Sequence, residues 1–209
     1  MNDAIMALER DRMRILGALH ALEHHMDQLL QNNAPGDVTM ADFSRFFRLF
    51  GDVHFATKVD DILLPDLVRC KAGLDMDVVS EVRAAHELQQ YHLLTMEQYV
   101  DSASHRDNDS RRALVSQMQA FIESQRRVCT TLETAVFPLV DKMTSEEQQG
   151  LKYELEQFDR ASIGRHERAD LTDLYERLLG ANSIAAVISS RRATEHCDSE
   201  PQQSGVFTD

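Results

Sequence analysis

Two stretches decide the fold of this chain, and each ends in a proline: FGDVHFATKVDDILLP at residues 50–65 and ESQRRVCTTLETAVFP at residues 123–138. Counted back from its proline, each stretch has an apolar residue ten positions before and another six positions before. Residues four apart share one face of a helix, so each apolar pair is predicted to point into a helical core. The four residues are Phe55, Val59, Val128 and Leu132.

The pattern extends to the segments that precede these stretches. Each stretch follows a helix-forming segment that carries a histidine, His24 in the first half and His86 in the second. The composition is typical of helices, with only 8 glycines, 4 prolines and no tryptophan among 209 residues. A two-helix unit used twice predicts an all-α fold, an antiparallel four-helix bundle with an approximate internal two-fold axis.

Turn signals predict where the helices begin and end. Pro65 and Pro138 should bend or stop their helices, because proline lacks the backbone N–H donor. We expect one helical domain over residues 1–181 and a tail without fixed structure over residues 182–209. The expected helices cover about residues 3–30, 39–70, 76–102 and 109–143, then a short helix opened by the capping-box spacing of Thr144 and Glu147, and another over about 165–179.

These segments resemble the bacterial hemerythrin family, the HHE or hemerythrin-like cation-binding domains. The pair Glu23-His24 is similar to the family's first-helix motif, and the run at residues 86–88, His-Glu-Leu, is similar to its third-helix motif. The resemblance runs from about residue 10 to about residue 180. It implies a hemerythrin-like antiparallel four-helix bundle with two short C-terminal helices.

The polar half of the family's diiron site is missing. In the family, the second and fourth helices each carry a His-x-x-x-Glu motif. The resemblance implies that these motifs fall at Phe55 and Val59 and at Val128 and Leu132, which are all apolar. Because both halves lose both ligands and all four replacements suit a core, we expect hydrocarbon to fill the cavity and no cofactor to be bound.

A substitute metal site is the first alternative. His20 and His24 are four residues apart, and His86 would complete a set of three histidines, which suits one non-haem iron or zinc ion. The interpretation that we favour is that no metal binds and that His24 and His86 are buried histidines, hydrogen-bonded across the bundle.

A second alternative shifts the site by one residue. Asp60, Cys129 and Glu133 each lie one position beyond a family ligand position, and His54 and Asp61, seven apart, would share a face. One residue turns a helix by about 100°, so these groups would enter from the flank of the core. We expect instead that Asp60 and Glu133 lie at the core boundary, paired with Lys58 or Arg127, and that Cys129 is a buried, inert thiol.

The composition and the absent motifs disfavour several classes of protein. A net charge of −13 disfavours nucleic acid as a partner. The chain has no apolar run of about 20 residues, no signal-like N-terminus and three scattered cysteines, so we expect a cytoplasmic protein without a membrane partner. It also lacks the motifs of nucleophilic and phosphate-binding enzymes.

We therefore expect a non-enzymatic bundle with a degenerate diiron site that has a regulatory or protein-interaction role, its protein partner unknown. The alternative is a metal-binding protein that senses or stores oxygen, nitric oxide or iron around His24 and His86.

Overall fold

The computed structural model describes residues 3–31, 38–103, 108–162 and 168–180. These residues form helices and short connections, with no strand among them, so the predicted all-α class is confirmed for this part of the chain. The helices are α1 (Asp3–Leu30), α2 (Met40–Phe46), η1 (Phe47–Ala56), η2 (Lys58–Leu63), α3 (Leu64–Arg69), α4 (Met76–Ala103), α5 (Asn108–Thr131), η3 (Leu132–Val136), η4 (Phe137–Lys142) and α6 (Ser145–Ser162). A further helix covers residues 168–180.

Two predicted helix starts carry capping boxes. Asp42 N–H donates to Thr39 Oγ1 at 3.3 Å, and Thr39 N–H donates to Asp42 Oδ2 at 3.0 Å. The same reciprocal pair joins Thr144 and Glu147, with distances of 3.3 and 2.7 Å. Each box satisfies donors that the first turn of a helix leaves without partners, which places the starts of α2 and α6.

Wide π-helical turns precede both prolines. Leu64 N–H donates to the carbonyl of Val59 and Phe137 N–H to the carbonyl of Leu132, five residues back in each case. The following prolines, Pro65 and Pro138, have no N–H, and their rings would crowd an ordinary α-helical turn. The repeat in the sequence is therefore also a repeat in backbone geometry.

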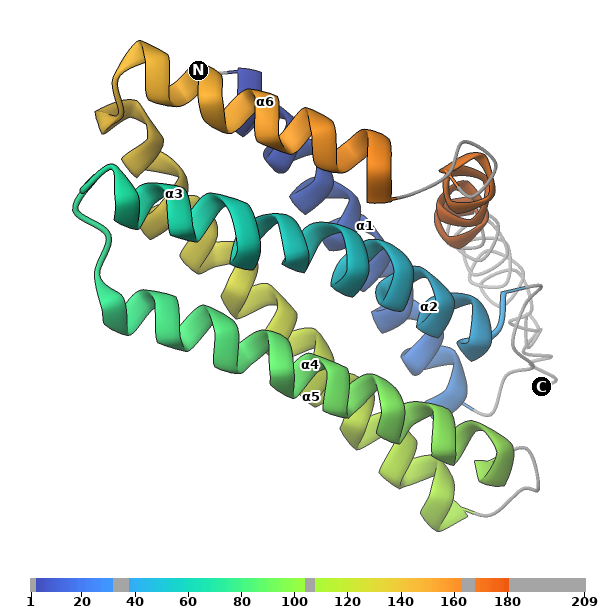
Figure 1. Ribbon diagram of the computed structural model, residues 1–209. Helices are drawn as coiled ribbons and strands as arrows, with labels where there is room; N and C mark the ends of the chain where they lie inside the picture. Colours follow the sequence, from blue (N-terminus) through green and yellow to red (C-terminus); the bar gives the residue numbers. More distant parts are fainter. Residues whose placement is uncertain (1–2, 32–37, 104–107, 163–167, 181–209) are drawn as a thin grey trace, which may run out of the picture.

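The long helices run alongside one another around a common core (Figure 1). α4 and α1 both pack along α5, while α6 packs on η2 and α1. Phenylalanines on α2 and η1 belong to this core, with Phe46, Phe47 and Phe55 each at most 2% exposed. The helix over residues 168–180 is attached there by Tyr175, which stacks on Phe46 with 5.6 Å between ring centroids.

Among the described residues, no helix combines the length and apolarity needed to span a membrane. The expected tail, residues 182–209, and the turns at residues 33–36 and 164 lie outside the described part of the chain.

Candidate functional site

The four positions where the resemblance places missing metal ligands are all in the apolar core. Phe55 is 2% exposed, Val128 3%, and Val59 and Leu132 are fully buried. All four belong to one continuous cluster of apolar side chains. Hydrocarbon offers no donor atom to a metal ion, so these positions contribute packing.

The acid next to Val59 contacts the histidine of α4. His86 Nδ1 lies 2.7 Å from Asp60 Oδ2, and the His86 side chain is 5% exposed. Asp60 is thus a partner of His86 and not of Lys58, which corrects the pairing expected from the sequence.

The corresponding acid of the second half has a different partner. Glu133 accepts a hydrogen bond from Arg12 at 2.9 Å, so the expected pairing with Arg127 is not the one observed. Its neighbour Cys129 is 1% exposed. Burial raises the pKa of this thiol to about 12, with Glu133 and Glu9 adding to the effect and Arg12 opposing it. Cys129 therefore stays protonated at neutral pH, which makes it a poor nucleophile.

The histidines of α1 lie in three different environments. His20 is on the surface, with a side chain that is 77% exposed, and the half-buried His24 contacts Gln28 in its own helix at 3.1 Å. His25 is the buried one, 6% exposed and packed 5.3 Å from the ring of Phe43. Burial, assisted by the nearby His24, lowers the pKa of His25.

Within the described ranges, no group of three or more His, Cys, Asp or Glu side chains is arranged to hold a metal ion. The alternative set of His20, His24 and His86 is accordingly not assembled there, and His24, expected to be buried and bonded across the bundle, is half-buried and contacts its own helix. His86 is the member that lies in the interior, and it contacts Asp60.

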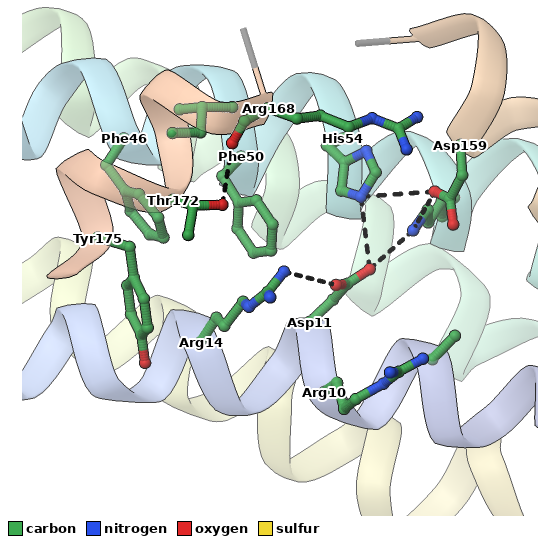
Figure 2. A pocket seen from close by; sticks show the side chains of 13 residues that line it. Arg10, Asp11, Arg14, Phe46, Phe50, His54, Asp159, Arg168, Thr172 and Tyr175 are labelled. Carbon is green, nitrogen blue, oxygen red and sulfur yellow. Dashed lines mark hydrogen bonds and ion pairs between the residues drawn. The ribbon is translucent and has the colours of Figure 1, made fainter. Parts of the chain in front are cut away.

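A polar cavity lies elsewhere, between α1, α2, η1, η2, α6 and the helix over residues 168–180 (Figure 2). Its volume is about 330 Å³. One part of its wall is aromatic and includes Phe46, Phe50 and Tyr175, and another part is ionic. The remaining lining residues are Ala7, Arg10, Asp11, Arg14, His54, Lys58, Asp159, Arg168, Leu171 and Thr172.

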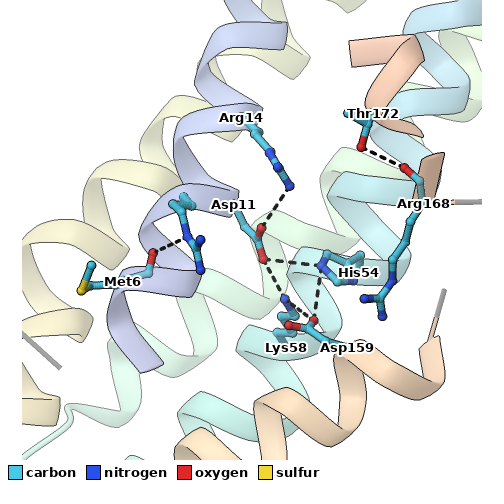
Figure 3. A network of polar contacts seen from close by, with 9 residues as sticks. Met6, Asp11, Arg14, His54, Lys58, Asp159, Arg168 and Thr172 are labelled. Carbon is cyan, nitrogen blue, oxygen red and sulfur yellow. Dashed lines mark hydrogen bonds and ion pairs between the residues drawn. The ribbon is translucent and has the colours of Figure 1, made fainter. Parts of the chain in front are cut away.

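The ionic part is centred on a buried lysine (Figure 3). Lys58 Nζ lies 2.7 Å from Asp11 Oδ2 and 2.5 Å from Asp159 Oδ1, and its side chain is 2% exposed. His54 Nε2 lies 3.5 Å from the same oxygen of Asp11 and 3.6 Å from that of Asp159. These four residues belong to α1, η1, η2 and α6, so their contacts link four helical segments.

The carboxylate of Asp11 is kept ionised by its neighbours. Burial alone would raise its pKa, but the contacts with His54 and the charge and hydrogen bond of Lys58 outweigh burial, so the pKa of Asp11 is lowered. Lys58 is the nearer of the two partners, at 2.7 Å. A buried charge pair of this kind is tolerated because each charge has a close partner.

Sequence reasoning did not find this cluster. It assigned His54 a face shared with Asp61, yet His54 is buried and Asp61 is exposed, because the π-helical turns between them change the angle at which side chains leave the helix. The sequence does contain one sign of this cluster. His54 and Lys58 are four residues apart, so they share a helix face that is offset by one position from the face of Phe55 and Val59. The helix thus has two buried faces, since α6 covers the second.

Comparison of the chain with models of protein families, with curated proteins and with solved structures finds no match.

Proposed function

We propose that this chain is a divergent hemerythrin-like four-helix bundle that works without a diiron centre, as a cytoplasmic, non-enzymatic regulatory protein that binds another protein. The observation that carries the proposal is the burial of Phe55, Val59, Val128 and Leu132, none more than 3% exposed. A diiron site in a bundle requires imidazoles and carboxylates that converge from facing helices. Apolar side chains occupy those positions here.

The neighbouring polar groups support this interpretation because they contact other residues of the protein. Asp60 lies against His86, and Glu133 accepts from Arg12. A group that already satisfies a partner must give up that contact before it can coordinate an ion.

One surface feature supports a protein partner. Leu88, Tyr91 and Leu94 follow one another at three-residue intervals on α4 and are 46%, 60% and 52% exposed. Exposed aliphatic and aromatic side chains that gather on one helix are typical of protein–protein contacts, and tyrosine is a frequent anchor residue.

The test is the metal content of the full chain, produced with iron supplementation and purified without a metal-affinity column. Elemental analysis should find iron and zinc far below one equivalent. The competing proposal, a sensor or store of oxygen, nitric oxide or iron with a mononuclear site, predicts one equivalent that is lost in His24→Ala or His86→Ala. Two irons per chain would overturn the assignment of the missing ligands.

The partner is tested separately, with a surface variant that leaves the core intact. The double variant Leu88→Ser/Tyr91→Ser should lose a protein that co-purifies with the wild-type chain, measured by quantitative mass spectrometry. Tyr153→Ser is the matched control, because Tyr153 is 63% exposed on a different helix, α6. Equal recovery of every co-purifying protein with both variants would contradict a role for this face of α4.

A further inference from the structure

The cavity beside Lys58 has the size and lining of a site for a small molecule. Its volume, about 330 Å³, lies in the range of roughly 300–1,000 Å³ that ligand sites occupy. Figure 2 shows Phe46 and Tyr175 toward one end of the cavity and His54 and Asp159 toward the other. An occupant would therefore meet an apolar surface and a polar surface at once.

The charges around the cavity are opposite in sign to those of the whole chain. Four cationic side chains line it, and only two carboxylates do, although the protein carries a net charge of −13. The two carboxylates are those of Asp11 and Asp159, and both contact Lys58. The other cationic side chains of the lining are those of Arg10, Arg14 and Arg168.

The arginines approach the cavity from two sides. Arg10 and Arg14 project from α1, and Arg168 extends from the helix that faces it, passing beside His54 in both close views (Figures 2 and 3). Arg14 is 49% exposed, and its closest carboxylate oxygen, on Asp11, is 3.9 Å away. Its guanidinium lies 5.8 Å from the centroid of the Phe50 ring. A guanidinium has five N–H donors, so Arg14 retains donors for an anionic group.

His54 provides an independent indication that the site is incomplete. Its side chain is 9% exposed and lines the cavity, yet Nδ1 has no hydrogen-bond partner among the described residues. Buried polar atoms in proteins almost always have a partner, protein or otherwise.

We propose that this cavity binds a small organic anion, with one carboxylate or phosphate group on an apolar body about the size of one ring. The anionic group faces Arg14, and the ring packs against Phe50, Leu171 and Tyr175. The buried Lys58 cluster forms the fixed wall behind them. None of the four apolar positions discussed above lines this cavity, so the proposal does not depend on the metal question.

The test is an NMR titration of the ¹⁵N-labelled full chain with three probes that share a phenyl ring. Benzoate carries a carboxylate, phenyl phosphate carries a phosphate, and benzyl alcohol is neutral. We expect saturable shifts around the cavity with at least one of the two anions, and binding of benzyl alcohol at least about fivefold weaker. The anion that binds more tightly identifies the preferred head group.

Variants separate the charge from the shape of the site. Arg14→Gln should weaken binding of the preferred anion about fivefold and leave benzyl alcohol unaffected. Arg112→Gln is the matched control, since it removes the same charge from an 83% exposed side chain on α5 that does not line the cavity. Ala7→Phe should fill the cavity and abolish binding of all three probes.

The proposal is overturned if neither anion gives saturable shifts at millimolar concentration, or if the shifts lie outside the cavity. It is also overturned if benzyl alcohol binds as tightly as both anions, or if Arg14→Gln binds the anions like Arg112→Gln. The spectrum of each variant reports its fold, so loss of binding through unfolding is recognised directly.

Discussion

His86 and Asp60 are hydrogen-bonded to each other across two helices, with 2.7 Å between Nδ1 and Oδ2. His86 is 5% exposed, and Asp60 follows Val59, whose carbonyl accepts the five-residue hydrogen bond before Pro65. The contact ties α4 to η2 at the level where the family resemblance places a metal ligand. A protein carboxylate thus supplies the polar partner that this buried imidazole requires.

A double-mutant cycle should measure this contact. Asp60→Asn and His86→Ala should each destabilise the protein, and together they should cost less than the sum, with a coupling of about 1 kcal/mol. Urea unfolding of the four proteins gives the values. Asp61→Asn is the control, because it removes the same charge from an exposed neighbour. Strictly additive losses would mean that the contact contributes nothing to stability.

Val128→His places an imidazole at a buried position where the hemerythrin resemblance implies a metal ligand. Because Val128 is 3% exposed among apolar neighbours, we expect a loss of roughly 1–3 kcal/mol through a buried polar group without a partner. Val53→His places the same residue at a position that is 46% exposed and should cost little. Chemical denaturation compares the two variants. Equal stability of both would show that Val128 borders a space able to accept the ring.

Much of the fold could be predicted because its signals are local. The spacing of apolar residues, the capping residue Thr39 and the two prolines each act within one or two turns, and the bounds of α1, Asp3–Leu30, agree with the expected helix. The π-helical turns before Pro65 and Pro138 could not be predicted, because only the structure shows that each N–H bonds to the carbonyl five residues back. These turns change which of the following side chains face the core.

The cavity could not be predicted for a different reason. Asp11, Lys58 and Asp159 are far apart in the sequence, and each alone has the character of a surface residue. They become a buried cluster only because α6 packs on α1 and η2. A periodicity argument assigns a helix one buried face, whereas the segment with His54 and Lys58 has two.

Lys58→Met should destabilise the protein by about 3 kcal/mol or more at neutral pH. The substitution keeps an unbranched side chain but leaves the buried carboxylate of Asp11 without its closest cation, 2.7 Å away. The double variant Asp11→Asn/Lys58→Met removes the uncompensated charge and should recover part of the loss. Urea unfolding compares the variants. A double variant as unstable as the single one would show that packing, and not charge, accounts for the effect.

The ion pair of Asp11 and Lys58 should also make the stability of the protein depend on pH. The pKa of Asp11 is lowered in the folded protein, despite the opposing effect of burial, through His54 and Lys58. A lowered pKa contributes stability above the unfolded-state pKa of about 4, and this contribution is lost as the pH falls toward the folded-state value. Removing Lys58 raises the pKa of Asp11, so Lys58→Met should lose less stability than wild type between about pH 6 and about pH 3. Parallel stability curves for the two proteins would contradict this assignment.

Gly17→Ala should loosen the helix over residues 168–180, although alanine favours helices. A Cβ at Gly17 would lie 2.6 Å from the hydroxyl oxygen of Tyr175, closer than any ordinary contact. Tyr175 cannot simply turn aside, because its ring stacks on Phe46 with an interplanar angle of 23°. Hydrogen exchange of residues 168–180 should therefore become faster in the variant.

Two further variants isolate the cause of this loosening. Gly150→Ala meets no atom within 4 Å in α6 and should stabilise the protein by roughly 0.5–1 kcal/mol, the usual gain from replacing glycine in a helix. Tyr175→Phe removes the hydroxyl, so the next ring atom is 3.5 Å from the added Cβ, an ordinary contact. Gly17→Ala/Tyr175→Phe should then restore slow exchange over residues 168–180. The opposite result is that Gly17→Ala alone stabilises the protein as Gly150→Ala does, with unchanged hydrogen exchange. That result would contradict the close packing of α1 against Tyr175.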